Sequence, residues 1–365
     1  MLFDFKVLSI GHLEAGVSGK APHYAVKFAE RYGSPADNYL NAGAALYRLD
    51  ELLEDAKNLK DNFDKWVPED NRWAPWVGSE IISYYGVAFV TCLEWHARSR
   101  LVDLLTFKPS AAKTDDLRVI KEKVVIEMFA ANVTLPAIVG AVTSVSNLDD
   151  YLNIFARIFE ALGQQIDAWA ALKAERPGTG KPWVETVEFD DLYNLYSSRH
   201  DLVHEIGITR IGHINVRDRL SPNEALRIGD IVQRSMLAIE SALTRVAPAD
   251  FPNLLDIQGQ PVSTLSHIEE EIGRLEKSVG TMTTAFTDEP VEADPNWGPA
   301  KTAAADYLAQ ERKFIDGASM LHNRYVEMRE PLRIALAKSR LDYLRSVIDM
   351  VGEVWDVSSP PSGNP

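Results

Sequence analysis

Four residues in one short stretch of the chain could carry chemistry: Arg199, His200, Asp201 and His204. Histidine titrates near neutral pH, so it can take or give a proton during a reaction. A guanidinium is always charged and suits a phosphate whose negative charge grows in the transition state. Arg199 and His204 could therefore combine acid–base chemistry with the binding of an anionic group such as a phosphate, and His200 and Asp201 could orient the pair.

The spacing of Arg199 and His204 makes a site on a single helix difficult. Residues five apart on an α-helix point about 140° apart around the axis. A composite site between two facing helices removes this difficulty. The spacing alone carries little information, because an arginine five to seven residues before a histidine is expected about once by chance in a chain of this composition.

Two other interpretations of the same stretch stay open. His200 and His204 lie four apart and could hold a metal together, as in a zincin helix, but Asp201 replaces the catalytic glutamate and Arg210 stands at the third ligand position. Alternatively, Ser198 and Asp201 could form a capping box at a helix start, and His204 could be an ordinary core residue. Because Asp201 and Arg210 depart from the zincin pattern, we expect no metal site.

Helical periodicity dominates the segments that must position these residues. Apolar residues at three- and four-residue steps predict an all-α fold, apart from one short strand at residues 2–9. Ser221-Pro222-Asn223-Glu224 predicts a capping box at one helix start. The predicted helices cover residues 39–64, 79–106, 116–131, 148–175, 189–207, 222–246, 265–279, 300–328 and 331–356.

Composition limits the classes of function. The net charge of −15 argues against a protein that coats or stores nucleic acid, so RNA could bind only at a local basic patch. A single cysteine excludes an internal disulfide and a cysteine-based zinc site. The start resembles no signal peptide and no apolar run is long enough for a membrane span, so we expect a cytoplasmic protein without a membrane partner.

The stretch Arg199-His200-Asp201-Leu202-Val203-His204-Glu205 resembles the signature of the HEPN superfamily (higher eukaryotes and prokaryotes nucleotide-binding). In that family one helix carries an arginine, a polar residue, three more residues and a histidine. The resemblance covers residues 77–248, with a long first helix, intervening helices, the motif helix, a short loop and a closing helix.

The resemblance implies a metal-independent endoribonuclease without a cofactor, acting as a homodimer through its motif helix. RNA cleavage would leave a 2′,3′-cyclic phosphate and a 5′-hydroxyl, with Arg199 and His204 as catalytic residues. Such enzymes serve as toxins or anti-phage effectors, which implies an antitoxin or regulatory protein as a further partner. One branch carries a tyrosine that a partner enzyme modifies, but Ile206 stands at that place here.

Further site residues follow from the resemblance and from charge. The family often has an acidic residue on the first helix that reaches the motif arginine, and Glu94 is the candidate. The favoured interpretation of Glu94 is nevertheless an ordinary surface pair with Arg98, four residues later. Arg210, Arg217 and Arg219 lie in the most basic stretch near the motif and are candidates for RNA phosphate contacts.

Composition shifts predict the domain organisation. A Pro/Trp-rich stretch at residues 66–76 and a second break near Pro248 to Pro261 separate three helical regions. We expect an N-terminal helical extension (1–76), a HEPN-like domain (77–248), a C-terminal helical domain (249–357) and a disordered tail (358–365). The alternative function is a helical binding or scaffold protein that uses the same fold without chemistry.

Overall fold

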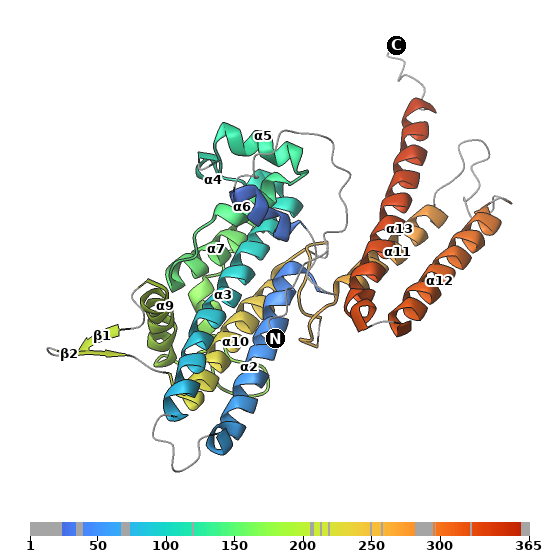
Figure 1. Cartoon of the computed structure of the whole chain (residues 1–365). Coiled ribbons are helices and arrows are strands. Elements are labelled where there is room, and N and C mark those ends of the chain that lie inside the picture. Colours follow the sequence, from blue (N-terminus) through green and yellow to red (C-terminus); the bar gives the residue numbers. More distant parts are fainter. Residues whose placement is uncertain are drawn as a thin grey trace.

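A computed structural model of the chain is almost entirely α-helical, which confirms the predicted fold class (Figure 1). The expected strand at residues 2–9 and residues 359–365 of the expected tail lie outside the described part. The structure describes residues 24–33, 39–66, 74–118, 120–204, 208–211, 214–217, 220–248, 250–256, 258–281, 295, 297–321 and 323–358.

The larger body is built around one long central helix, α3. It packs against α2, α6, α7, α9 and α10, so its buried residues surround the axis instead of forming one stripe. The helices of this body are α1 (Tyr24–Ala29), α2 (Asn41–Trp66), α3 (Ala74–Phe107), α4 (Thr114–Arg118), α5 (Glu122–Ala130), α6 (Leu135–Val142), α7 (Leu148–Ala161), α8 (Ala168–Lys173), α9 (Glu188–His204) and α10 (Pro222–Val246), with short 3₁₀ turns at Glu30–Tyr32 and Pro109–Ala111.

Helix α2 shares the main hydrophobic core. Its residues Leu46, Leu49 and Leu52 belong to the same buried cluster as Leu93 of α3 and Ile239 of α10. The expected boundary between residues 76 and 77 therefore does not separate two cores. The apolar stripe of α2 is covered by α3 and α10, and these residues are an integral part of the body that carries the motif.

The predicted start of α10 is confirmed in detail. The Ser221 side chain accepts a hydrogen bond from the Glu224 backbone N–H at 3.2 Å, and the Glu224 carboxylate accepts one from the Ser221 backbone N–H at 2.9 Å. Pro222 occupies the first turn, where a missing N–H costs nothing. Two of the free N–H groups at this helix start are thus satisfied locally.

A two-stranded hairpin follows the motif helix, where a short loop was expected. Strands β1 (Ile208–Ile211) and β2 (Ile214–Arg217) pair antiparallel, with Ile211 opposite Ile214. The β-branched residues of this segment favour strands over helices. Apart from this hairpin and isolated bridges, the described residues contain no sheet.

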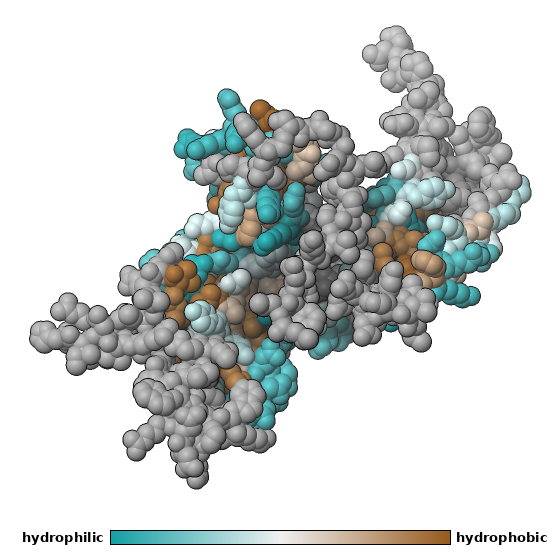
Figure 2. All heavy atoms as spheres, in the orientation of Figure 1, coloured by the Kyte–Doolittle hydropathy of each residue, from teal (hydrophilic) through white to brown (hydrophobic). Residues whose placement is uncertain are grey.

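The C-terminal helices form a second, smaller body. They are α11 (Thr264–Thr281), α12 (Trp297–Leu321) and α13 (Asn323–Ser358). Helix α13 packs against both α11 and α12, and its Ile334 and Leu341 share a small core with Ile268 and Ile272 of α11. Figure 2 shows hydrophobic residues gathered in both places, over the larger body and among the C-terminal helices.

The break between the last two helices lies earlier than expected. Helix α12 ends at Leu321 and α13 runs through Pro331, whereas the sequence predicts a break just before this proline. Proline lacks the N–H for one backbone hydrogen bond and is therefore disfavoured inside a helix. Here Arg329 and Arg333, on either side of Pro331, both donate to Asp316 of α12 at 3.0 and 2.7 Å. These bonds tie the helix to its neighbour across the proline.

Within the described ranges, none of the helices combines the length and the apolar composition needed to cross a bilayer.

Candidate functional site

Helix α9 carries the motif and is fixed to the body along its length. Leu192, Leu195 and Tyr196 are buried, and α9 packs against α3, α7 and α10. At its first residue, Glu188 accepts a hydrogen bond from Arg234 of α10 at 2.8 Å. Because α9 begins ten residues before Ser198, the capping-box interpretation of Ser198 and Asp201 is wrong.

Glu94 of α3 reaches the motif arginine. Its Oε1 lies 3.3 Å from Nη2 of Arg199, and its Oε2 lies 3.6 Å from Nη1 of Arg98. The favoured interpretation, a pair with Arg98 alone, is thus incomplete, because the two oxygens serve two different helices. The Glu94 side chain is 12% exposed and that of Arg199 is 31% exposed, so the pair joins a buried carboxylate to a partly accessible guanidinium.

Two buried polar groups near this pair lack hydrogen-bond partners among the described residues. They are Nε of Arg199 and the hydroxyl of Tyr196. Burial raises the pKa of the Tyr196 hydroxyl, and the Glu94 charge adds to this shift. Burial also raises the pKa of Glu94, although Arg98 and Arg199 partly oppose it. Tyr196 therefore stays protonated beside the motif arginine.

The structure describes the side chains of only some of the other predicted site residues. His200 is exposed and Asp201 is half-buried on α9. His204 is the last residue of α9, but its side chain lies outside the described part of the structure. Arg210 and Arg217 lie on opposite strands of the hairpin, where Arg210 faces Asn215 and Arg217 faces Ile208, and their side chains are likewise outside. Arg219 lies outside the described residues altogether.

A buried polar network lies in the larger body and was not predicted as a unit. His96 is fully buried, with Nε2 2.8 Å from Oε1 of Glu240 and Nδ1 2.9 Å from the hydroxyl of Tyr151. Arg100 donates to both oxygens of Glu240, from Nε at 3.0 Å and from Nη2 at 2.8 Å. It also donates to the carbonyl of Pro252 at 2.6 Å. The network thus joins α3, α7, α10 and the segment after α10.

The protonation states in this network follow from burial and charge. Burial lowers the pKa of His96, so the ring is neutral, donates to Glu240 and accepts from Tyr151. Burial alone would raise the pKa of Glu240, but the Arg100 charge and the hydrogen bond from His96 hold it below its usual value. The network therefore contains one buried ion pair and one neutral imidazole, and its neighbours leave it no accessible face.

The sequence does not predict this network, because its members lie far apart along the chain. Glu240 lies 144 residues from His96, and only the fold brings the two together. One signal was present in the sequence: Glu240 falls among apolar residues of α10 at a core spacing. A charge at such a position requires a buried partner.

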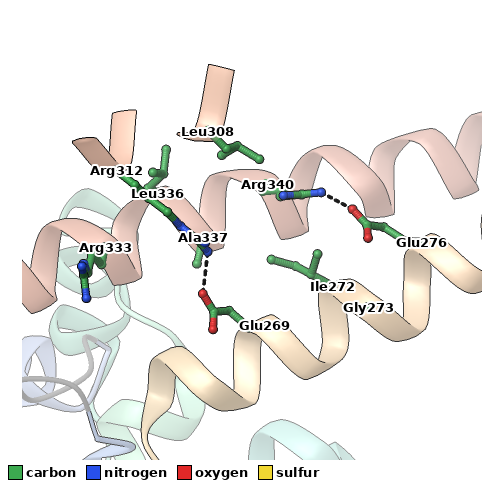
Figure 3. A pocket seen from close by; sticks show the side chains of 10 residues that line it. All are labelled: Glu269, Ile272, Gly273, Glu276, Leu308, Arg312, Arg333, Leu336, Ala337 and Arg340. Atoms are coloured by element: carbon green, nitrogen blue, oxygen red, sulfur yellow. Dashed lines mark hydrogen bonds and ion pairs between the residues drawn. The ribbon is translucent and has the colours of Figure 1, made fainter. Parts of the chain in front are cut away.

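A second cluster of charges surrounds a pocket of about 240 Å³ among α11, α12 and α13. Figure 3 shows Glu269 and Glu276 of α11 facing arginines of the other two helices across Ile272. Glu269 pairs with Arg312 at 2.5 Å, and Glu276 pairs with Arg340. Because each carboxylate already has a guanidinium partner, these charges brace the three helices against one another.

The described residues contain no group of three or more histidine, cysteine, aspartate or glutamate side chains arranged to hold a metal ion. The zincin-like interpretation of His200 and His204 depends in part on the His204 side chain, which is not described.

Comparison with protein-family models, with curated proteins and with solved structures found no match.

Proposed function

We propose that this chain is a metal-independent endoribonuclease of the HEPN type that works as a homodimer through α9. The observation that carries the proposal is the ion pair between Glu94 of α3 and Arg199 of α9. A carboxylate from α3 pairs with the motif arginine, which remains partly exposed near the end of the motif helix. This arrangement matches what the HEPN resemblance implies for the acidic residue of that helix.

The chemistry needs two groups around one scissile phosphate. The ribose 2′-oxygen attacks the adjacent phosphorus while the bond from phosphorus to the 5′-oxygen breaks, and the proton passes from the 2′-hydroxyl to the leaving oxygen. His204 serves as the general acid or base for this transfer. Arg199 stabilises the negative charge of the phosphorane. The products are a 2′,3′-cyclic phosphate and a 5′-hydroxyl, and no cofactor takes part.

Glu94 serves as a positioning residue in this scheme. It pairs with Nη2 of Arg199 and leaves the other terminal nitrogen, Nη1, for a phosphate. The neighbouring hydroxyl of Tyr196 and the Nε of Arg199 are buried polar groups that find no protein partner in the described residues. An arginine fixed in this way loses less side-chain entropy when it binds the transition state.

RNA binding must overcome the net charge of −15. The hairpin that follows α9 carries Arg210 and Arg217 on paired strands, which favours it as the local phosphate-binding element. RNA as the substrate also favours a cytoplasmic location, and a toxin-like activity would require an antitoxin or another regulatory protein as a partner.

The test compares wild type with Arg199→Ala and His204→Ala in growth assays and by mapping RNA 3′ ends in EDTA. We expect wild-type cleavage to survive chelation and both variants to lose about a hundredfold or more of it. The matched control is Arg227→Ala, which removes a different ion pair between α10 and Asp191 of α9 and should leave cleavage unchanged. Cleavage abolished by EDTA would support the metal interpretation, and absence of cleavage would support the binding or scaffold protein.

A further inference from the structure

Helix α12 presents a stripe with two exposed aromatic rings on the side that faces away from α13. Tyr307 is 61% exposed and Phe314 is 71% exposed, and because they are seven positions apart, about two helical turns, both lie on one face. Ala303, Gln310 and Gly317 are exposed and complete a pattern of alternating four- and three-residue steps. A repeat of this kind is typical of the seam of a coiled coil.

The inward face of α12 is a separate stripe. Leu308 and Ile315 are half-buried and buried, and α13 is the helix on which α12 packs most extensively. Figure 1 shows α12 at the edge of the C-terminal helices, with α13 beside it. The two aromatic residues repeat at heptad spacing on the side of this edge helix away from its packed face. Such a pattern is typical of a surface that binds another helix.

We propose that this stripe is a dimerisation surface, on which α12 of a second copy of the chain packs antiparallel. The sizes of the side chains are complementary in this arrangement. Phe314 would lie against Ala303 of the partner subunit, and Tyr307 against Gln310 of the partner subunit. An aromatic ring opposite a smaller side chain fills the space between two helices.

The flanking charges select this orientation. Asp306 and Lys313 are both exposed and lie on the same flank of the stripe. In the antiparallel arrangement Asp306 faces Lys313 of the partner subunit, and the two-fold axis repeats the attraction on the other side. In a parallel arrangement Asp306 would face Glu311 of the partner subunit, which is repulsive. Charges at these flanking positions set partner choice and orientation in coiled coils.

This surface is independent of the proposed nuclease, because none of its residues belongs to α9 or to the motif. The first test uses disulfide crosslinking of the full chain in mixtures of Tyr307→Cys and Gln310→Cys. We expect a covalent dimer in the mixture and little with either variant alone. Cys92 does not compete, since it is 4% exposed and burial raises its pKa to about 12. Tyr343→Cys, on the exposed side of α13, is the matched control and should not crosslink with either variant.

Charge reversal provides the second test. Asp306→Lys or Lys313→Asp turns both of the symmetry-related Asp306–Lys313 pairs into pairs of like charge. Either change should therefore slow crosslinking and weaken the dimer roughly tenfold. Combining both changes in one chain restores opposite charges and should restore crosslinking. The proposal is overturned by a mixture that gives no covalent dimer, by crosslinking of Tyr307→Cys alone, or by a double reversal that remains as weak as the single ones.

Discussion

Glu94 divides its two oxygens between an arginine of its own helix and the motif arginine of α9. Glu94→Gln keeps the shape of the side chain but removes the charge that positions Arg199. If the nuclease proposal is correct, we expect kcat to fall up to about a hundredfold, because a small misplacement of a catalytic group is costly, while KM for RNA changes little. Steady-state kinetics on a short RNA measures this effect.

The matched control is Glu54→Gln on α2, which changes an exposed carboxylate and should alter neither constant. Equal kinetics for wild type and Glu94→Gln would mean that the pair with Arg199 only braces two helices.

Glu240 is the residue whose loss should cost the most stability. Its carboxylate is fully buried and neutralises Arg100, which is fully buried as well. Among the described residues, Glu240→Gln leaves that guanidinium with Asp103, at 3.1 Å, as its one charged partner. Removing one member of a buried ion pair typically costs about 3 kcal/mol or more. Urea unfolding followed by circular dichroism should show this loss, whereas Glu54→Gln should change stability by less than about 0.5 kcal/mol.

His96 should make the stability of the protein depend on pH. Its pKa in the folded chain lies below the usual 6.5, because burial disfavours the charged ring. As the pH falls below 6.5 the unfolded chain takes up a proton that the folded chain does not, so stability declines with a slope of at most about 1.4 kcal/mol per pH unit. Above that pH the contribution of His96 is complete.

Unfolding free energies measured between pH 7.5 and 5.5 for wild type and His96→Gln isolate this contribution, because all other titrating groups are common to both. We expect the wild type to lose more stability on acidification than the variant. Parallel profiles for the two proteins would show that His96 titrates as it does in the unfolded chain.

At the scale of elements, α10 packs on α2 and α3 at a point where only glycine fits. A Cβ added to Gly229 would lie 2.8 Å from a ring carbon of Phe89 and 2.5 Å from a methyl carbon of Leu53. Gly229→Ala should therefore lower stability by about 1–3 kcal/mol, although alanine is the better helix former. Gly273→Ala on α11 meets no atom within 4 Å and should instead raise stability by about 0.5–1 kcal/mol. Thermal unfolding of both variants compares the two effects.

The elements that the sequence predicts well are those with a local cause. The start of α10 follows from Ser221 and Glu224, whose bonds span three residues. The hairpin after α9 was missed, because its strands hold only four residues each. A signal was nevertheless present, since Gly212-His213 between two β-branched runs is a pattern typical of a tight hairpin.

In the candidate site, too, the part with a local cause was predictable and the part that depends on packing was not. Arg199 and His204 lie on one local motif, and the reach of Glu94 to Arg199 was named as an alternative through the HEPN resemblance. The division of Glu94 between two arginines depends on how α9 packs against α3, and packing is not a local property of the sequence. The same holds for the network of His96, Arg100 and Glu240.

At the scale of the whole molecule, the main hydrophobic core of the larger body and the core of the C-terminal helices share none of the described residues. The larger core includes Leu101 of α3 and extends to Phe251 and Leu255 beyond the end of α10. The start of the expected C-terminal domain at residue 249 therefore still contributes to the larger core. The smaller core, in α11 and α13, includes Leu341 and is far poorer in aromatic residues.

Separate cores of unequal size should unfold separately, because the stability of each body depends on the apolar area that it buries itself. Leu341→Ala should lower the transition of the C-terminal helices by about 2–4 kcal/mol and leave the other transition unchanged. Leu101→Ala should have the reverse effect, since Leu101 is fully buried in the larger core. Hydrogen exchange followed peptide by peptide in urea reports each body by itself. If both variants shifted all peptides of the two bodies together, the molecule would unfold as one cooperative unit, and the interface between the bodies would have to supply the coupling.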